Sequence, residues 1–235
     1  MRPSHNWLDE LPRERLLVEM SLWSADLGRM SDEIGRVDGF ADLYHLDVAD
    51  GHFSPDILLF PDLVRMIRRS TARPLHVHLM VDDSILMAQI RQFADAGADA
   101  LSIHAENRHV EEGLGLLAEL GMVAGLVLQL HTPVTVVDRF LDRLGILTLL
   151  GTRIGVKGQD LDGQATARLT EAKDKIFRAK HTRRILLASD GGNRRHTVPL
   201  LRAAGADTVV LGSLAFNDPD LPQRMTWLHA LPQEA

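Results

Sequence analysis

The chain of 235 residues contains no cysteine, so it can form no disulfide bond and can offer no thiolate to a metal ion. Any metal bound by this protein must therefore be held by histidine and carboxylate side chains. The sequence also lacks an apolar run of about 18 residues, which is the length that a helix needs to span a bilayer. Its first residues, MRPSHNWLDELPRER, lack the apolar centre of a signal peptide. We therefore expect a cytoplasmic protein with no membrane partner.

Clustered positive charge is absent as well. The 26 lysines and arginines are outnumbered by 32 aspartates and glutamates, which gives a net charge of -6. A protein that binds nucleic acid needs a clustered basic surface, so we expect no nucleic-acid partner. We interpret the three adjacent arginine pairs as solvated helix or loop surface; they are Arg68 with Arg69, Arg183 with Arg184, and Arg194 with Arg195.

The chain does contain a regular alternation of short apolar runs with longer amphipathic ones, which is typical of a parallel sheet with helical connections. The predicted strands are 16–20, 43–48, 75–80, 100–103, 123–128, 146–150, 185–189 and 208–211. The predicted helices are 27–37, 61–69, 84–96, 110–120, 134–143, 166–178 and 197–204. Two near repeats, AGADALSIHAE (96–106) and AGADTVVLGS (204–213), mark helix-to-strand joints at which a glycine closes the helix.

This pattern predicts an α/β protein with one (β/α)8 TIM barrel. The length is close to the roughly 250 residues of a typical barrel. We expect an N-terminal lead-in over residues 1–14 and a single barrel domain over residues 15–235. A doubly wound open sheet is the alternative, but the sequence contains no GxGxxG motif and the number of predicted strands favours closure.

The stretch YHLDVADGHF (44–53) carries the densest chemistry in the chain. In a strand, side chains alternate between two faces, so His45 and Asp47 share one face while Tyr44, Leu46 and Val48 share the other. A polar inner face is unusual for a strand that only fills a core, because buried imidazole and carboxylate groups need partners. The alternative is a His–Asp pair that is satisfied within the core.

Other polar residues also fall at the carboxyl ends of predicted strands, where barrel enzymes place their active sites. His78 lies on the strand HVHLM and Asp190 follows a later strand, so two histidines and two aspartates are expected at one mouth. Such a set suits Zn2+, Mn2+ or Fe2+. A Gly-Gly pair and a Gly-Ser pair follow the last two strands, at positions where barrels often bind phosphate through backbone N–H groups; the alternative for either pair is simple turn chemistry. These pairs are Gly191 with Gly192, and Gly212 with Ser213.

Taken together, the motifs resemble those of the ribulose-phosphate 3-epimerase family over residues 16–216. They appear here as MSLWSAD (family PSxLSAD), HLDVADGHF (HxDxMDGxF), HVHLMV (DxHLMV), IGVKGQ (PGFGGQ), SDGG (VDGG) and LGSLAF (AGSAxF). The resemblance implies a metal-dependent epimerase that inverts C3 of a ketose phosphate through a metal-stabilised 2,3-ene-diolate. It implies one divalent metal ion as cofactor and a small-molecule ketose phosphate as substrate.

The resemblance also implies roles for individual residues. Asp47 and Asp190 correspond to the two acid/base groups, and His45 and His78 join them as metal ligands. The positions that contact the sugar or its phosphate are Ser21, Met80, Gly155, Gly158, Gly191, Gly192, Gly212 and Ser213. The chemistry agrees with these residue types, because two carboxylates on opposite sides of a planar intermediate can remove a proton and return one to the other face.

The sequence departs from the family pattern around the expected sugar site. Ala49 and Leu150 replace methionines, and Arg153 and Lys157 replace an asparagine and a small residue. We expect the apolar wall to be shorter, mostly at residue 49. We also expect a substrate other than, or in addition to, D-ribulose 5-phosphate, with Arg153 or Lys157 in contact with its extra acidic or hydroxyl groups. The alternative is that both basic side chains point to solvent.

A second departure lies deeper in the predicted barrel. Glu19 replaces a small residue and His76 replaces an aspartate, and strand parity turns both side chains inward. We predict that they pair, because an unpaired buried charge costs several kcal/mol. The alternative is that ordered waters satisfy each of them separately.

Two further functions remain open at this point. One is another isomerase, aldolase or decarboxylase on the same phosphate-binding barrel, although the DxKxxD pattern of related decarboxylases is missing. The other is a barrel that binds sugar phosphate without catalysis, although all four candidate ligands are present. We also expect a homo-oligomer, with Phe53, Ile57 and Leu59 as exposed apolar contacts.

Overall fold

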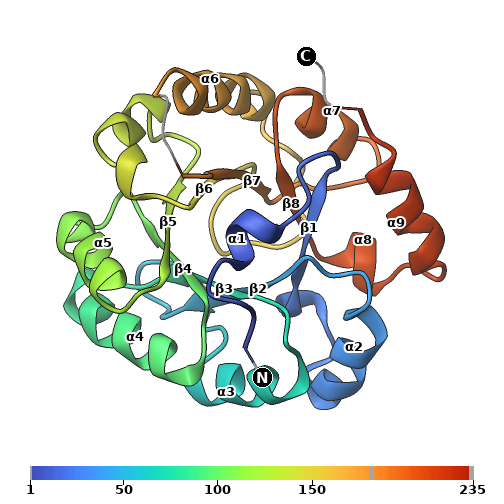
Figure 1. Cartoon of the computed structure of the whole chain (residues 1–235), viewed down its shortest axis with the longest axis horizontal. Helices are drawn as coiled ribbons and strands as arrows, with labels where there is room; N and C mark the ends of the chain where they lie inside the picture. Colours follow the sequence, from blue (N-terminus) through green and yellow to red (C-terminus); the bar gives the residue numbers. More distant parts are fainter. Residues whose placement is uncertain (1, 180–182, 233–235) are drawn as a thin grey trace.

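A computed structural model of the chain describes residues 2–179 and 183–232. In this part of the chain, eight parallel strands pair in sequence order and β8 pairs with β1, so the sheet closes into a barrel (Figure 1). The predicted (β/α)8 barrel is therefore confirmed, and the open sheet is excluded. The strands are β1 (Leu17–Ser21), β2 (Leu43–Ala49), β3 (Leu75–Met80), β4 (Ala100–His104), β5 (Val123–Leu128), β6 (Ile146–Leu150), β7 (Leu186–Asp190) and β8 (Thr208–Leu211).

Helices surround the barrel and pack their apolar faces on the outside of the strands (Figure 1). In α4, for example, the buried residues Leu86, Ile90 and Phe93 follow helical spacing and so lie on one face. Within the two described ranges, no helix is both long and apolar enough to cross a membrane. The main helices are α2 (Met30–Val37), α3 (Pro61–Ser70), α4 (Asp83–Ala96), α5 (Val110–Glu119), α6 (Ala165–Arg178), α7 (Val198–Ala203), α8 (Ser213–Phe216) and α9 (Leu221–His229).

Two predicted helices differ from the structure. Residues 134–143 form two 3-10 helices, η3 (Val134–Arg139) and η4 (Leu141–Arg143), instead of an α-helix. The β-branched sequence VTVV that follows Pro133 disfavours α-helix, because branched side chains lose rotamer freedom there. The predicted helix 27–37 begins with a separate 3-10 turn, η2 (Leu27–Arg29), which Asp26 caps by accepting a hydrogen bond from the Gly28 N–H.

The N-terminal lead-in contains a short helix, α1 (Trp7–Glu10), that lies across the centre of the barrel (Figure 1). Trp7 is only 6% exposed. It belongs to a small apolar cluster formed by the first inward residues of several strands, so α1 covers the amino-terminal opening. The other buried members of this cluster are Leu17, Leu43, Ala100, Ile146, Leu186 and Ala188.

Two arginines that we predicted to be solvated are bound to the protein instead. Arg68 is buried, and it pairs with Asp99 at 2.6 Å and donates to two backbone carbonyl groups. Arg184 is half-buried and donates to three carbonyl oxygens just before the barrel, at 2.6 to 3.0 Å, which holds α1 in place. The prediction of solvated surface is wrong for these two residues because each guanidinium donates to backbone carbonyl groups of the protein.

Aspartates join neighbouring strands at the amino-terminal end of the barrel. Asp42, Asp99 and Asp207 each precede an even-numbered strand and accept a hydrogen bond from a backbone N–H of the preceding strand at 2.9 to 3.0 Å. Each also pairs with a basic side chain; the pairs are Arg15 with Asp42, Arg68 with Asp99, and Lys173 with Asp207. The aspartates that end the two AGAD repeats, Asp99 and Asp207, therefore make the same kind of contact with the preceding strand.

The loop after β2 contains the three apolar residues that we expected to be exposed for contact between protomers, and the structure exposes only one of them. Ile57 is 83% exposed, but Leu59 is only 5% exposed and packs in the core. Phe53 is half-buried and its ring lies 4.9 Å from that of His104. Of the three residues named, only Ile57 is an exposed apolar side chain, and a homo-oligomer stays a prediction.

We expect Trp7→Ala to lower the free energy of unfolding by about 3 to 5 kcal/mol, because it removes a large buried side chain from beneath the barrel. Denaturant unfolding measured by circular dichroism checks this value. The control is Phe177→Ala, since Phe177 is 83% exposed on α6 and its removal should change stability by less than about 0.5 kcal/mol. Equal stability of the two variants would show that α1 contributes little.

Candidate functional site

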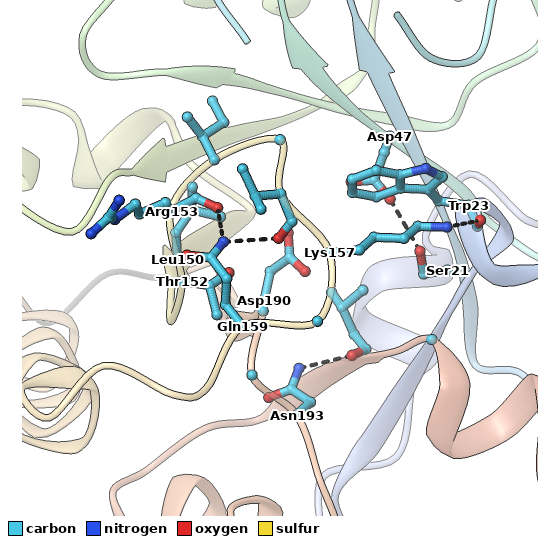
Figure 2. A pocket seen from close by; sticks show the side chains of 18 of the residues that line it. Ser21, Trp23, Asp47, Leu150, Thr152, Arg153, Lys157, Gln159, Asp190 and Asn193 are labelled. Atoms are coloured by element: carbon cyan, nitrogen blue, oxygen red, sulfur yellow. Dashed lines mark hydrogen bonds between the residues drawn. The ribbon is translucent and has the colours of Figure 1, made fainter. Parts of the chain in front are cut away.

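A cavity of about 330 Å3 opens at the carboxyl ends of the strands, opposite to α1. Figure 2 shows Asp190 next to the loop that follows β6, and Asp47 next to Trp23 and hydrogen-bonded to Ser21. Most of the residues that the sequence predicts to act here line this cavity. They are Ser21, Asp47, His78, Met80, Leu150, Arg153, Gly155, Lys157, Gly158, Asp190, Gly191, Gly192, Gly212 and Ser213.

The centre of the site is formed by two carboxylates and two imidazoles. Strands β2 and β3 pair so that Asp47 lies beside His78, and both side chains point inward. The Asp47 Oδ1 atom lies 3.2 Å from His45 Nε2 and 3.3 Å from His78 Nδ1. The Asp190 Oδ2 atom, which comes from β7, lies 3.7 Å and 3.5 Å from the same two nitrogens. The two aspartates therefore meet at the same pair of imidazoles.

Asp47 is held in its ionised form. Burial by itself would raise the pKa of Asp47, but the charges and hydrogen bonds of His45 and His78 outweigh it and hold the pKa far below its usual value. The Ser21 hydroxyl donates a hydrogen bond to the second carboxylate oxygen, Oδ2, at 3.0 Å. This contact fixes the orientation of the carboxylate at the floor of the cavity.

The four side chains fit a divalent metal ion. One donor atom from each of His45, Asp47, His78 and Asp190 lies within 4.8 Å of the other three. His45 is fully buried behind the cavity wall, and its Nε2 atom has no hydrogen-bond partner among the described residues although it faces the aspartates. Such a buried lone polar atom is costly unless it gains a ligand, and imidazole with carboxylate suits several divalent ions.

The pKa values of His45 and His78 are raised, whereas the pKa of His104 is lowered. Burial favours the neutral form of each ring, yet Asp47 and the other acidic partners raise the pKa of His45 well above its usual value. Burial likewise opposes protonation of His78, whose pKa the hydrogen bonds to Asp190 and Asp47 raise. Burial lowers the pKa of His104 to about 4, despite its bond to Glu106. The aspartates therefore favour protonation of the two rings next to them, while burial favours the neutral form of the His104 ring behind them.

The predicted pair of Glu19 and His76 is confirmed. The Glu19 Oε2 atom lies 2.7 Å from His76 Nδ1, and the same oxygen lies 3.1 Å from His45 Nδ1. Burial would raise the pKa of Glu19, but the charges and hydrogen bonds of His76 and His45 outweigh it and lower the pKa far below its usual value. Glu19 is thus an ionised carboxylate inside the barrel.

A further pair, His104 and Glu106, was not predicted. His78 Nε2 lies 2.9 Å from His104 Nε2, and His104 Nδ1 lies 3.0 Å from Glu106 Oε2. A carboxylate can only accept, so His104 carries its hydrogen on Nδ1 and accepts from the His78 Nε2–H. In the deprotonated His78 ring that a metal ligand requires, this arrangement leaves the Nδ1 lone pair facing Asp47 and Asp190. The signal in the sequence was the motif SIHAE, with polar residues where β4 ends.

The glycines around the cavity hold backbone conformations that other residues rarely adopt. Gly191 and Gly192 have φ values of 86° and 72°, and both line the cavity. A Cβ atom at Gly192 would lie 2.8 Å from the backbone of Leu161. The β6 and β7 loops can therefore approach each other only because residue 192 has no side chain, which leaves backbone groups at the cavity wall.

The mouth of the cavity is bridged by Lys157 and Trp23, as Figure 2 shows. The Lys157 Nζ atom donates to the Trp23 carbonyl oxygen at 2.6 Å and lies 4.5 Å from the centre of the indole ring. Burial lowers the pKa of Lys157, while the charge of Asp47 opposes this shift. Arg153 is exposed, and its side chain extends away from Asp47 and Asp190 (Figure 2).

Ala49 is not among the residues that line the cavity, although it pairs with the lining residue Met80, so the loss of wall volume at residue 49 stays a prediction. The loop after β2 folds back, and the Leu58 N–H donates to the Ala49 carbonyl oxygen at 3.1 Å, which leaves Ala49 only 4% exposed. Leu150 lies in the wall as expected. The sequence interpretation missed other lining residues, although Trp23 stands inside the quoted motif MSLWSAD; they are Trp23, Ser24, Thr152, Ile154, Val156, Gln159, Asn193, Arg194 and Val210.

Solved structures with the same overall fold support the barrel architecture of this chain. The chain is similar to 3-keto-L-gulonate-6-phosphate decarboxylase from Vibrio cholerae, with a TM-score of 0.67, 14% sequence identity, and coverage of 91% of this chain and 99% of the other. It is also similar to orotidine 5'-phosphate decarboxylase from Pyrococcus horikoshii, with a TM-score of 0.62, 15% identity, and coverage of 90% and 97%. At these identities the likeness concerns the fold alone.

Comparison with curated sequences goes further. Residues 17–216 match the model of the ribulose-phosphate 3 epimerase family. The chain is 38% identical over 205 residues to ribulose-phosphate 3-epimerase of Bacillus subtilis, covering 86% of this chain and 93% of that protein. It is 33% identical over 212 residues to ribulose-phosphate 3-epimerase of Escherichia coli, covering 88% and 92%. This chain therefore belongs to the ribulose-phosphate 3-epimerase family and is an enzyme of the isomerase class.

Proposed function

We propose that this enzyme is a metal-dependent epimerase that inverts C3 of a ketose phosphate by proton transfer between two aspartates. The observation that carries the proposal is the meeting of Asp47 and Asp190 at the same two imidazole nitrogens, at 3.2 to 3.7 Å. The carboxylates come from β2 and β7 and face the same cavity. Membership of the family supports the reaction class.

The proposed cofactor is one divalent ion, Zn2+, Mn2+ or Fe2+, held by His45, Asp47, His78 and Asp190. When bound, such an ion acts as a Lewis acid that stabilises negative charge developing on the sugar oxygens. The chain provides two nitrogen and two oxygen donors for it. The His104 and Glu106 contacts support this role, since they leave the His78 Nδ1 lone pair directed at the aspartates.

The two aspartates move the proton. One carboxylate removes the C3 hydrogen, and the electron pair of that C–H bond moves toward the neighbouring C2 carbonyl oxygen to form the ene-diolate. The second, protonated carboxyl group returns a proton to C3 from the opposite face, and the carbonyl group reforms. Ser21 keeps Asp47 oriented through its hydrogen bond to Oδ2. Met80 adds a polarisable apolar surface to the cavity wall.

The phosphate of the substrate is proposed to bind the glycine-rich wall. Gly155 and Gly158 in the β6 loop have φ values of 68° and 80°, and the glycines after β7 have similar values. Runs of this kind expose backbone N–H groups, which bind anionic oxygens well. The residues that we assign to this subsite are Gly155, Gly158, Gly191, Gly192, Gly212 and Ser213, all of which line the cavity.

We further propose a substrate other than, or in addition to, D-ribulose 5-phosphate. Lys157 places a cation at the mouth, near the charge of Asp47, while Leu150 replaces the methionine expected in the wall. An ammonium group there favours a substrate with an extra acidic or hydroxyl group. Arg153 extends away from the aspartates (Figure 2), so Lys157 is the better candidate for this contact. Cytoplasmic location stays a prediction.

We expect Asp47→Asn and Asp190→Asn each to lower turnover by about a hundredfold to ten-thousandfold, because an amide cannot carry the proton. The measurement is exchange of deuterium from solvent into C3 of pentulose, hexulose and tetrulose phosphates, together with metal analysis of each variant. The control is Asp174→Asn on the exposed face of α6, which should leave exchange unchanged. Turnover near that of the unaltered enzyme in either active-site variant would remove that residue from the acid/base role.

We expect metal binding to release protons. The pKa values of His45 and His78 are raised, which favours protonated rings in the metal-free protein, whereas a ligand nitrogen must be deprotonated. The affinity for Zn2+ should therefore fall as the pH drops from about 8 to about 6. Calorimetry in two buffers of different ionisation enthalpy counts the released protons. An affinity that does not change with pH would contradict these protonation states.

We expect Lys157→Gln to change the ratio of specificity constants among pentulose, hexulose and tetrulose phosphates by about tenfold or more, because it removes the cation at the mouth. Lys175→Gln is the matched control, since Lys175 pairs with Asp138 outside the cavity. Arg153→Ala should have a smaller effect. The proposal of altered specificity is wrong if D-ribulose 5-phosphate has the highest specificity constant and neither Lys157→Gln nor Arg153→Ala changes any ratio.

A further inference from the structure

Three buried polar residues lie behind the candidate metal ligands and take no part in the proton transfer. Glu19 on β1, His76 on β3 and Ser102 on β4 are all 0% exposed. A polar side chain in such a position destabilises the fold unless it is hydrogen-bonded, and a charged one does so more strongly. The hydrogen-bond partners of these three residues therefore indicate their role.

The three residues form a chain of hydrogen bonds that ends at His45. The Glu19 Oε2 atom accepts from His76 Nδ1 at 2.7 Å and from His45 Nδ1 at 3.1 Å. Because His76 carries its hydrogen on Nδ1, its Nε2 atom accepts from the Ser102 hydroxyl at 2.6 Å. Gly125 on β5 makes room for that hydroxyl, since a Cβ at residue 125 would collide with Ser102 Oγ.

This chain determines which nitrogen of His45 is free. A carboxylate has no hydrogen to donate, so the His45 Nδ1 atom must carry one, and in the neutral ring that a metal ligand requires Nε2 keeps its lone pair. Nε2 is the buried atom that has no hydrogen-bond partner among the residues described, and it lies 3.2 Å from Asp47 Oδ1. The carboxylate of Glu19 thus turns the ligand nitrogen toward the aspartates.

We propose that Glu19 is a positioning residue for the metal, which sets the tautomer and the ring orientation of His45, and that His76 and Ser102 hold Glu19 in place. This inference rests on the proposed metal site. Carboxylates that accept from a ligand histidine fix its ring and raise its basicity in this way. Glu19 touches neither the aspartates nor the cavity, so it is not itself catalytic.

The geometry of Glu19 favours this role over a purely structural one. Both imidazole N–H groups approach the same oxygen, Oε2, while Oε1 is buried with no hydrogen-bond partner in the described part of the chain. A carboxylate that served only to stabilise the barrel would be expected to use both oxygens. The Glu19 carboxylate is instead oriented so that one oxygen accepts from both the His45 and the His76 rings.

The test is the affinity of Glu19→Gln for Zn2+, measured by competition with a chromophoric chelator. Loss of the carboxylate should weaken binding about tenfold to a hundredfold, as for other residues that orient a ligand histidine. Ser102→Ala, which removes the support of His76, should weaken binding less and in the same direction. The matched control is Thr208→Val, because the Thr208 hydroxyl is buried in β8 with no hydrogen-bond partner within residues 2–179 and 183–232, so its loss should leave the affinity unchanged.

A second readout separates positioning from general stability. Nitrogen-15 spectra of the Zn2+-loaded protein report which imidazole nitrogen of His45 carries hydrogen, and Glu19→Gln should change the signal of the Nδ1–H. Unchanged affinity and an unchanged His45 signal in Glu19→Gln overturn the positioning role, even if the melting temperature falls. If Glu19→Gln does not fold, unchanged affinity in Ser102→Ala overturns it. Failure of the unaltered protein to bind Zn2+, Mn2+ or Fe2+ overturns the metal site and this inference with it.

Discussion

The site depends on the hydrogen-bond register between β2 and β3. In this register His45 lies beside His76 and Asp47 lies beside His78, so four polar side chains enter the barrel at two neighbouring levels. A slip of one residue in either strand would turn its polar residues toward the helices and its apolar residues into the barrel. Closure strengthens the constraint, because a slip in one strand of a closed barrel must be matched around the whole sheet.

Much of the fold and of the site could be predicted because two periodicities are visible in the sequence. Parity along a strand placed His45 with Asp47, and it also placed Glu19 opposite His76, which the structure confirms at 2.7 Å. The rule that polar residues gather where barrel strands end located the cavity. Both arguments use only the local geometry of strands, which can be inferred from a single sequence. The quoted motifs then indicated the family to which the comparisons assign the chain.

Other features depend on contacts between distant segments, which periodicity does not contain. The lead-in covers the barrel through Trp7, and the buried Arg68 pairs with Asp99, which lies 31 residues further along the chain. Ala49 is only 4% exposed because the chain after β2 folds back over it. His104 was missed because a single histidine in an apolar strand has no meaning until His78 lies 2.9 Å away. The 3-10 helices after Pro133 reflect branched side chains that an apolar count overlooks.

Three aspartates align the strands at the amino-terminal end of the barrel, whereas the candidate site lies at the carboxyl end. Asp42, Asp99 and Asp207 join even-numbered strands to their predecessors at the end opposite to the cavity. Strand alignment is thus secured at a place that the loops around the cavity do not reach. Those loops can gain, lose or exchange residues during evolution without shifting the strands that present the histidines and aspartates. A barrel built in this way can acquire a new substrate while it retains its chemistry, and a designer can graft new loops onto it for the same reason.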